Sequence, residues 1–515
     1  MKKQLSTKQK IIGLLFIFSL GVQFLISYDS YTHDLTEHTD SAWFFTCGKA
    51  WMNGLIPYID FADSKGPLLW LIYGIGYLIS HYDYTGVFWL SVINYTIVLY
   101  YSYLIFFIFL KDHKKALWGS ILMLSVYFCP LYHAETRAED WCMPFIVLAL
   151  FHSCRIFYDE TSNSPKSIFA ACLALGISLG GTLLIKYNMT IMLGAIALYM
   201  LYYIIHENQN ITLSFVAVLL GFLLIVGPFI IYMLIVDCLE AFVNEYFLNT
   251  IQTIESYNNS STYMREWLFL TYDAHHVLLF AIGCFGAYLM RNEVKKYRWF
   301  FLIAFLGFYA VAIHHSKFLH FHYLASCLPL TIWLCIALIK RVNRVTYSIL
   351  TIITTVTFYT IVGSLFRWGY LTQNLFFINS QTRNNYYNVV SYLSVIKNPT
   401  ITYYKTVDHG YGVPTGSLPA TRYWATQTDA TPEMLKSIHE SIRQRISDFV
   451  LTSDALQSFD KSDSILTSAG YRLLYQFELG PNNYTLYTKH PIKKPNETIS
   501  ISNADVLFKR NHFVE

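Results

Sequence analysis

Charged residues are scarce in this sequence. Asp, Glu, Lys and Arg make up 14% of the 515 residues, whereas hydrophobic residues make up 54%. Because ordinary soluble domains carry about 25% charged residues, this chain has too little polar surface to cover a soluble globule of its size. The mean hydropathy of +0.36 agrees. The composition therefore predicts a polytopic membrane protein and excludes an ordinary soluble enzyme.

Paired cysteines and basic stripes are lacking as well. The nine cysteines fall mostly inside apolar runs, and their spacing suggests neither a disulfide framework nor a zinc site. The net charge is only +4 and is spread over loops, so we expect no nucleic-acid partner. The sequence has no internal repeat and no low-complexity tract.

Long apolar runs dominate what is present. A helix needs about 20 apolar residues to cross roughly 30 Å of hydrocarbon, and we interpret about eleven runs as spans. They lie at 11–27, 85–110, 116–132, 141–158, 167–185, 188–205, 211–236, 274–290, 298–313, 321–339 and 344–363. The shorter run at 67–80 is interrupted by glycines, so we expect a re-entrant or interfacial half-helix there.

The basic loops suggest an orientation. If the N-terminal MKKQLSTKQK is cytoplasmic, the loops KDHKK, RNEVKKYR and KRVNR all fall on the same side, as the positive-inside rule requires. No small-residue cleavage site follows the first run, so we expect a retained anchor. An odd number of spans places the C-terminal part outside. We expect a bacterial inner-membrane protein with a cytoplasmic N-terminus.

The composition changes near residue 364. The predicted strands TITYY, SDFVLTSD and YRLLYQFEL flank or follow a helical pattern, TPEMLKSIHESIRQRI, in a segment rich in Asn, Thr, Ser and Asp. We therefore expect a transmembrane domain at 1–363, with its first external loop at about 28–84. A small periplasmic α/β domain is expected at 364–515.

The segment HTDSAWFFTCGKAWMNGLIPYIDFADSKGPLLW, residues 38–70, gathers charges at a membrane edge. Within it, Trp43, Cys47, Ala50 and Trp51 recur at helical spacing, which predicts a helix in the outer interface. Asp40 could simply cap this helix. A cap does not explain why further acids and a lysine follow in PYIDFADSKGP.

This segment resembles the first external loop of GT-C glycosyltransferases that use polyprenyl-phosphate sugars, of the family 39/83 type related to protein O-mannosyltransferases and aminoarabinose transferases. The matching residues are Asp40, Gly54, Pro57, Tyr58, Asp60, Lys65, Pro67 and Leu68. Two positions depart from the pattern: Gly66 replaces a proline, and Ser41 replaces an acid found in some members.

Later segments resemble the same family in the same order, over roughly residues 10–340. They are YHAETRAEDW, GGTLLIKYNMT, AFVNEYFLNTIQTIESY and KFLHFHYLASCLPL. Beyond them, LPATRYWATQ resembles a segment of the outer domain in relatives. The resemblance implies a GT-C fold and a lipid-linked sugar donor.

The resemblance makes Asp40 the catalytic base. A sugar on a lipid phosphate is already activated, so one carboxylate that takes the acceptor's proton suffices and the anomeric centre inverts, whereas glycosidases need two. For the donor phosphate the resemblance implies Lys65, and we add Arg137, Lys186, Lys317 and His322. Lys65 and Lys186 could instead be snorkelling side chains.

Sugar or acceptor contacts are expected from the remaining loop residues, namely Tyr58, Asp63, Glu139 and Asp140. The alternative for Asp140 is a helix cap, with Arg137 paired to a neighbouring acid. The dense histidines, His314, His315, His320 and His322, raise the question of a metal. No carboxylate accompanies them, so we expect no metal and no other cofactor.

We therefore expect an inverting membrane glycosyltransferase that acts on a lipid, glycan or protein hydroxyl. The alternatives are a flippase or transporter, or a polymerase or ligase, for lipid-linked glycans. Transporters usually carry charges within their spans, whereas here the acids gather at the outer edge. The sugar, the lipid length and the oligomeric state stay open.

Overall fold

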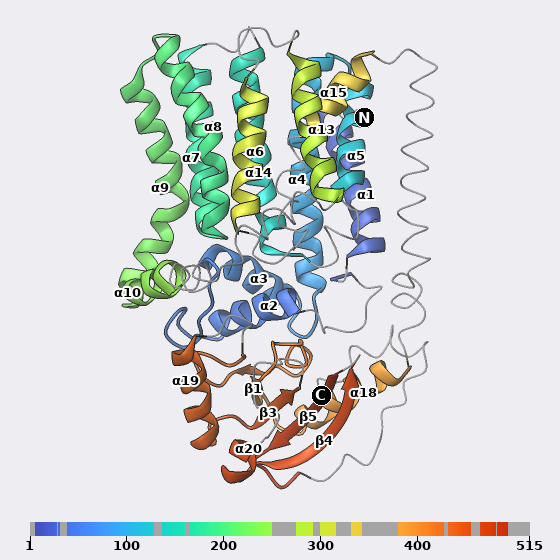
Figure 1. The fold of residues 1–515 in the computed structure, drawn as a ribbon, viewed down its shortest axis with the longest axis vertical. Coiled ribbons are helices and arrows are strands. Elements are labelled where there is room, and N and C mark those ends of the chain that lie inside the picture. Colours follow the sequence, from blue (N-terminus) through green and yellow to red (C-terminus); the bar gives the residue numbers. More distant parts are fainter. Residues whose placement is uncertain are drawn as a thin grey trace, which may run out of the picture.

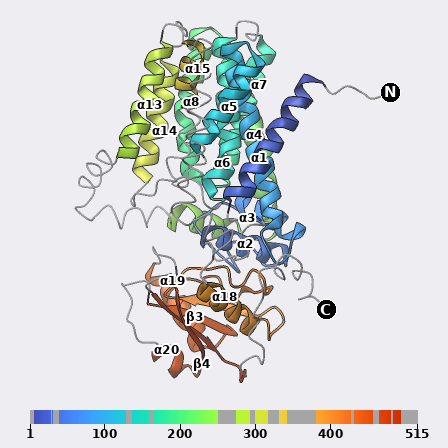
Figure 2. The same cartoon turned by 90° about the vertical axis from the view of Figure 1, so that its right-hand side faces the viewer.

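A computed structural model describes residues 6–27, 29–30, 39–127, 136–159, 164–249, 274–291, 299–315, 331–341, 380–426, 431–454, 464–479 and 482–492. These residues form a helical bundle and, at one end of it, a smaller unit of strands and helices (Figure 1). Two short helices lie between the bundle and this smaller unit, as the view from the side also shows (Figure 2).

Five described helices are long and apolar enough to cross a membrane. They are α4 (Thr85–Leu110), α6 (Ala138–Tyr158), α7 (Pro165–Leu183), α8 (Tyr187–His206) and α9 (Ile211–Ile235). Beside them lie α1 (Thr7–Ile26), α5 (His113–Tyr127), α13 (Ala274–Met290), α14 (Phe300–His315) and α15 (Ile332–Arg341). The multi-pass prediction is confirmed, while the count of eleven stays a prediction because the run at 344–363 lies outside the described residues.

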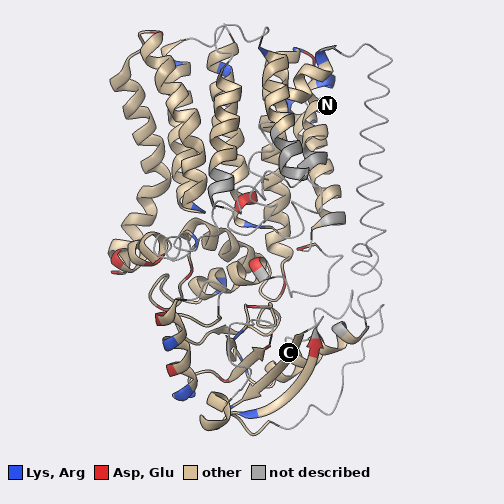
Figure 3. Ribbon diagram, viewed as in Figure 1, with Lys and Arg blue, Asp and Glu red and all other residues tan. Residues whose placement is uncertain are grey.

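The basic residues of the bundle lie near the ends of its helices. Along most of their length the helices carry no charge, while Lys and Arg colour the ends that point away from the smaller unit (Figure 3). Lys111 ends α4, and Arg155 and Lys166 flank the connection from α6 to α7. This distribution is the one that the positive-inside rule predicts for a cytoplasmic face. The orientation itself stays a prediction.

The two short helices are α2 (Thr39–Met52) and α3 (Pro67–Ile79). With 13 residues α3 is too short to cross a membrane, as expected. The pair packs very closely, since a Cβ added at Gly48 would lie 2.4 Å from the backbone nitrogen of Gly74. Residues 41–50 of α2 are all buried, so this helix is covered on more sides than an interfacial helix needs to be.

On the far side of α2 lies a five-stranded sheet, with strand order β2-β1-β3-β5-β4. The smaller unit that contains this sheet has the following described elements: α18 (Ser380–Leu393), β1 (Thr400–Tyr404), β2 (Leu418–Pro419), α19 (Pro432–Arg443), β3 (Phe449–Ser453), α20 (Ser464–Ser468), β4 (Arg472–Leu479) and β5 (Asn482–Thr488). β1 runs parallel to β2 and β3, whereas β5 runs antiparallel to β3 and β4. The three predicted strands and the predicted helix are confirmed; the boundary near 364 lies outside the described residues.

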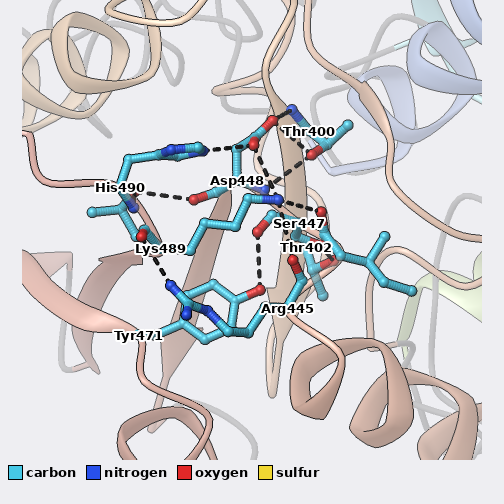
Figure 4. A network of polar contacts seen from close by, with 10 residues as sticks. Thr400, Thr402, Arg445, Ser447, Asp448, Tyr471, Lys489 and His490 are labelled. Carbon is cyan, nitrogen blue, oxygen red and sulfur yellow. Dashed lines mark hydrogen bonds and ion pairs between the residues drawn. The ribbon is translucent and has the colours of Figure 1, made fainter.

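A polar network ties the ends of three neighbouring strands together (Figure 4). Asp448, just before β3, accepts hydrogen bonds from the Thr400 nitrogen and hydroxyl at the start of β1, both at 2.9 Å. Its other oxygen lies 2.8 Å from His490 Nε2 and 3.2 Å from Lys489 Nζ, just after β5. Partial burial opposes ionisation, but the hydrogen bonds from His490, Thr400 and Lys489 prevail and lower the pKa of Asp448 to about 2.

Candidate functional site

The site lies where the bundle meets α2 and α3, and its first residue is Asp40. The helix α2 begins at Thr39, so Asp40 occupies its first turn instead of preceding it as a cap. Its carboxylate Oδ2 lies 3.8 Å from Arg137 Nε, and 47% of the Asp40 side chain is exposed. Asp40 is therefore an ion-paired acid that solvent and ligands can still reach.

Arg137 directly precedes α6, and Asp140 fixes how that helix starts. The Arg137 backbone nitrogen donates to Asp140 Oδ2 at 2.8 Å. The Asp140 side chain is buried, and Asn94 Nδ2 on α4 donates to its carbonyl at 2.9 Å. The helix cap expected as the alternative for Asp140 is thus present. Arg137, however, pairs with Asp40 of α2, and not with an acid of its own loop.

Glu139, in the first turn of α6, connects this helix to the start of α8. Lys186, the residue before α8, donates to Glu139 Oε1 in a pair that is 4% exposed on the glutamate and 13% on the lysine. Removing one partner would leave a buried charge alone, which is strongly unfavourable. The first turn of α6 therefore joins Asp40 on one side to Lys186 on the other.

The loop before α3 brings Lys65 to the same place. The Gly66 nitrogen donates to Ile185 O at 3.0 Å and the Leu68 nitrogen to Leu184 O at 2.9 Å, so the loop is bonded to the connection between α7 and α8. A Cβ at Gly66 would lie 2.1 Å from the Leu184 oxygen. A proline would also lack the N–H. This close approach explains why a glycine stands where the family pattern has a proline.

The other acids and the tyrosine of the segment 38–70 shape this loop. Asp63 is buried and accepts from the Ser64 nitrogen at 2.6 Å, while Lys65 Nζ donates to the Ser64 hydroxyl at 3.1 Å. Asp60 closes the preceding turn by accepting from the Ile56 nitrogen at 2.6 Å. Tyr58 is fully buried and donates its hydroxyl to Lys65 O at 2.9 Å, so in this structure it supports the lysine's backbone.

One buried acid beside the site carries no signal in the sequence. Asp29 follows α1 and accepts from the Thr136 nitrogen at 3.3 Å, next to Arg137. Burial raises the pKa of Asp29 to about 6, although hydrogen bonding with Thr136 opposes the rise. Neither a periodic pattern nor the family pattern singles out Asp29, so only the fold reveals its position.

Two predicted phosphate ligands, Lys317 and His322, lie outside the described residues. Within the ranges that the structure describes, no group of three or more His, Cys, Asp or Glu side chains could hold a metal ion. The described site therefore consists of an accessible carboxylate, Asp40, near an arginine, together with two lysines held by α6 and by the loop before α3.

Such a set suits a reaction in which a proton leaves a hydroxyl while negative charge builds on a phosphate. A positioned carboxylate can accept the proton, and fixed cations can stabilise the developing charge. Nearly half of the Asp40 side chain is exposed, whereas the Lys186–Glu139 pair is shielded from solvent. The site thus has a solvent-exposed side at Asp40 and a buried side at Lys186.

No model of a known protein family matches this sequence, and no curated protein matches it either. Among solved structures, ArnT from Cupriavidus metallidurans bound to undecaprenyl phosphate is similar at 11% identity and a TM-score of 0.64, over 93% of this chain and 98% of that chain. ArnT from the same organism in the apo state gives 10% identity and a TM-score of 0.61, over 94% and 99%.

The S. cerevisiae protein O-mannosyltransferase Pmt1-Pmt2 complex bound to the sugar donor matches more weakly, with 14% identity over 47% of this chain and 35% of that chain and a TM-score of 0.34. The two ArnT matches extend over more than nine-tenths of both chains. This chain therefore has the fold of ArnT, the GT-C fold that its first-loop segment predicts.

Proposed function

We propose that this chain is an inner-membrane glycosyltransferase that moves a sugar from a polyprenyl-phosphate donor to a hydroxyl acceptor at the periplasmic face. One observation carries the proposal: the first turn of α6 joins an accessible carboxylate, Asp40, to a lysine, Lys186, at the end of an apolar bundle. The ArnT structure with undecaprenyl phosphate supports a lipid phosphate as ligand, because the folds agree.

Asp40 is the base in this proposal. The acceptor hydroxyl loses its proton to the Asp40 carboxylate as its oxygen bonds to C1 of the sugar, and the bond from C1 to the phosphate oxygen breaks with inversion. Arg137 at 3.8 Å holds the carboxylate in place. Because nearly half of the Asp40 side chain is exposed, the proton can then pass to water.

The lysines receive the leaving phosphate. An ammonium group has three donors and no acceptor, so Lys186 can keep its bond to Glu139 and still donate to a phosphate oxygen. Lys65 carries the same group and donates to the Ser64 hydroxyl at 3.1 Å. Fixed cations stabilise charge that moves onto the phosphate without having to reorganise during the step. Lys317 and His322 stay proposed additions to this group.

The acids of the second loop are proposed to contact the sugar or the acceptor. Glu139 already fixes Lys186, and Asp140 fixes the start of α6, so their contact with substrate would come in addition to these bonds. Asp63 and Tyr58 are buried around the Lys65 loop. We propose that these two residues contribute to binding of the sugar or the acceptor through that loop. The acceptor is a lipid, a glycan or a protein, and no metal or other cofactor is proposed.

The test is sugar transfer in membranes supplied with radiolabelled polyprenyl-phosphate sugars. Replacing Asp40→Asn keeps the size of the side chain and removes the base, so we expect transfer to fall by about 10²–10⁴-fold while donor binding persists. Asp60→Asn is the matched control, because Asp60 lies in the same segment 38–70, where its carboxylate closes a turn by accepting from the Ile56 nitrogen. Equal transfer by wild type and Asp40→Asn would contradict the proposal, as would a wild type that consumes no donor.

A further inference from the structure

A segment of the smaller unit lies against the first-loop segment. We call residues Leu418–Thr426 the docking segment; it contains β2 and the TRYW sequence. The Ala62 nitrogen, just before Asp63, donates to Arg422 O at 3.0 Å. The rings of Trp424 and Trp43 pack in a tilted arrangement with their centroids 4.6 Å apart. The docking segment therefore touches both α2 and the loop that carries Lys65.

The docking segment also contacts a third element, the π-helix η2 (Val243–Leu248), which follows α10 (Leu239–Phe242). Glu245 of η2 is buried, and its Oε1 accepts from Arg422 Nη2 and, at 2.7 Å, from the Tyr423 hydroxyl. Its Oε2 accepts from Asn249 Nδ2 at 3.0 Å. Both carboxylate oxygens are thus satisfied. A buried carboxylate without its cation would be strongly unfavourable, so Arg422 holds η2 in place.

The next residue of η2 reaches the site. The Tyr246 hydroxyl donates to Leu183 O at 2.6 Å, at the end of α7, and its ring lies 5.7 Å from that of Tyr187, which follows Lys186. Phe242, just before η2, packs its ring 5.2 Å from that of Tyr58, whose hydroxyl supports Lys65. Glu245, which pairs with Arg422, therefore lies within one helical turn of Phe242 and Tyr246. These two residues contact the segments that carry Lys65 and Lys186. Departures from regular helix of this kind often mark functional sites.

We propose that Arg422 is a positioning residue for the candidate site: through Glu245 it holds η2 against the segments that present Lys65 and Lys186. The inference rests on the proposed function, in which these lysines receive the donor phosphate. Arg422 itself touches neither lysine; it acts through Glu245 and Tyr246. Loss of the contact should therefore weaken donor binding more than it slows the chemical step at Asp40.

The test is a double-mutant cycle on the full chain, with Arg422→Gln, Glu245→Gln and the double variant. Each single change is expected to raise the donor KM by about tenfold and leave kcat within about twofold, and the double change should be no worse than the worse single, because the pair acts as a unit. Arg422→Lys should stay within about threefold of wild type. Lys436→Gln, on an exposed ion pair of α19, is the matched control and should change nothing.

Hydrogen exchange of residues 239–249 provides a readout that needs no sugar transfer, and it should speed up in Arg422→Gln. Unchanged exchange there would overturn the positioning role, and so would single effects that multiply in the double variant, or a fall in kcat with the donor KM unaltered. If wild type transfers no sugar, the proposed function fails, whereas the exchange experiment still tests whether Arg422 holds η2.

Discussion

At the scale of single residues, Gly66 shows how a close backbone contact selects an amino acid. Gly66→Ala would place a Cβ 2.1 Å from a backbone oxygen that cannot rotate away, so the loop must shift. We expect a loss of about 1–3 kcal/mol of stability, typical of overpacking, and a raised donor KM because Lys65 moves. Thermal unfolding in detergent and donor titration measure the two effects.

Two further variants sharpen this expectation. Gly66→Pro restores the residue of the family pattern but also removes the N–H that bonds to Ile185, so it should be worse than Gly66→Ala. Gly13→Ala in α1 is the control, since nothing lies within 4 Å of the added Cβ there. A Gly66→Pro protein as stable as wild type would show that the loop does not depend on this approach.

The residues of the site differ in how visible they are in the sequence. Asp40, Lys65, Arg137 and Lys186 stand in segments that resemble known ones, and the structure brings these segments together through hydrogen bonds and ion pairs. Glu245 and Arg422 also lie in segments that resemble known ones, AFVNEYFLNTIQTIESY and LPATRYWATQ, but they are 177 residues apart and no local pattern predicts that they pair. A pair of this kind is defined by tertiary contact alone, so sequence reasoning passes over it.

At the scale of elements, local chemistry decides what can be predicted. The start of helix α19 can be predicted from two local residues. The Thr431 hydroxyl accepts from the Met434 nitrogen at 3.3 Å, and a proline occupies the first turn. The two-residue β2 has no pattern of its own and exists because it pairs with β1. The burial of α2 on its far side depends on partners more than 350 residues later in the chain, which helical spacing cannot reveal.

The network around Asp448 makes a prediction about the sheet. Asp448→Asn removes the charge that holds Thr400, Lys489 and His490, so the ends of β1, β3 and β5 should loosen by about 1–3 kcal/mol at pH 7. Hydrogen exchange at the strand ends of the full chain measures this. Glu440→Gln, on the exposed pair of α19, should have no effect.

The same variant has a defined pH dependence. The folded-state pKa of Asp448 is about 2, below its ordinary 3.8. A depressed carboxyl pKa stabilises the fold above the ordinary value, and this contribution is lost as the pH falls toward the folded value. The difference in stability at the strand ends between wild type and Asp448→Asn should therefore shrink below about pH 4. A difference that stays constant down to pH 2 would mean that the charge is not what matters.

At the scale of the whole molecule, the contact between the bundle side and the smaller unit is polar as well as aromatic. Thr46 on α2 donates to Asp408 Oδ2 at 2.8 Å, and Lys49, one turn later, donates to Gly412 O at 3.0 Å. Asp408 also accepts from Trp424 Nε1 at 3.4 Å. The helix α2, which carries Asp40 in its first turn, is thereby held by α3 on one side and by the smaller unit on the other.

Lys49 makes this contact sensitive to pH. Burial lowers the pKa of Lys49 to about 7, although Asp408 nearby opposes the shift, whereas an exposed lysine titrates near 10.5. Between these two values the unfolded or undocked chain holds a proton that the docked chain has lost. Stability therefore rises with pH from about 7 to about 10, by at most about 1.4 kcal/mol per pH unit.

Replacing Lys49→Met should remove this rise. Thermal unfolding of the full chain in detergent between pH 6.5 and 9.5 should show an upward slope in wild type that is absent from Lys49→Met, while the exposed Lys436→Met keeps the wild-type slope. At pH 6.5 the methionine variant should be the more stable protein, because no ammonium has to be deprotonated or buried. If Lys49→Met retains the full slope, another group controls the pH dependence, and the contact between α2 and the smaller unit is not tuned by this lysine.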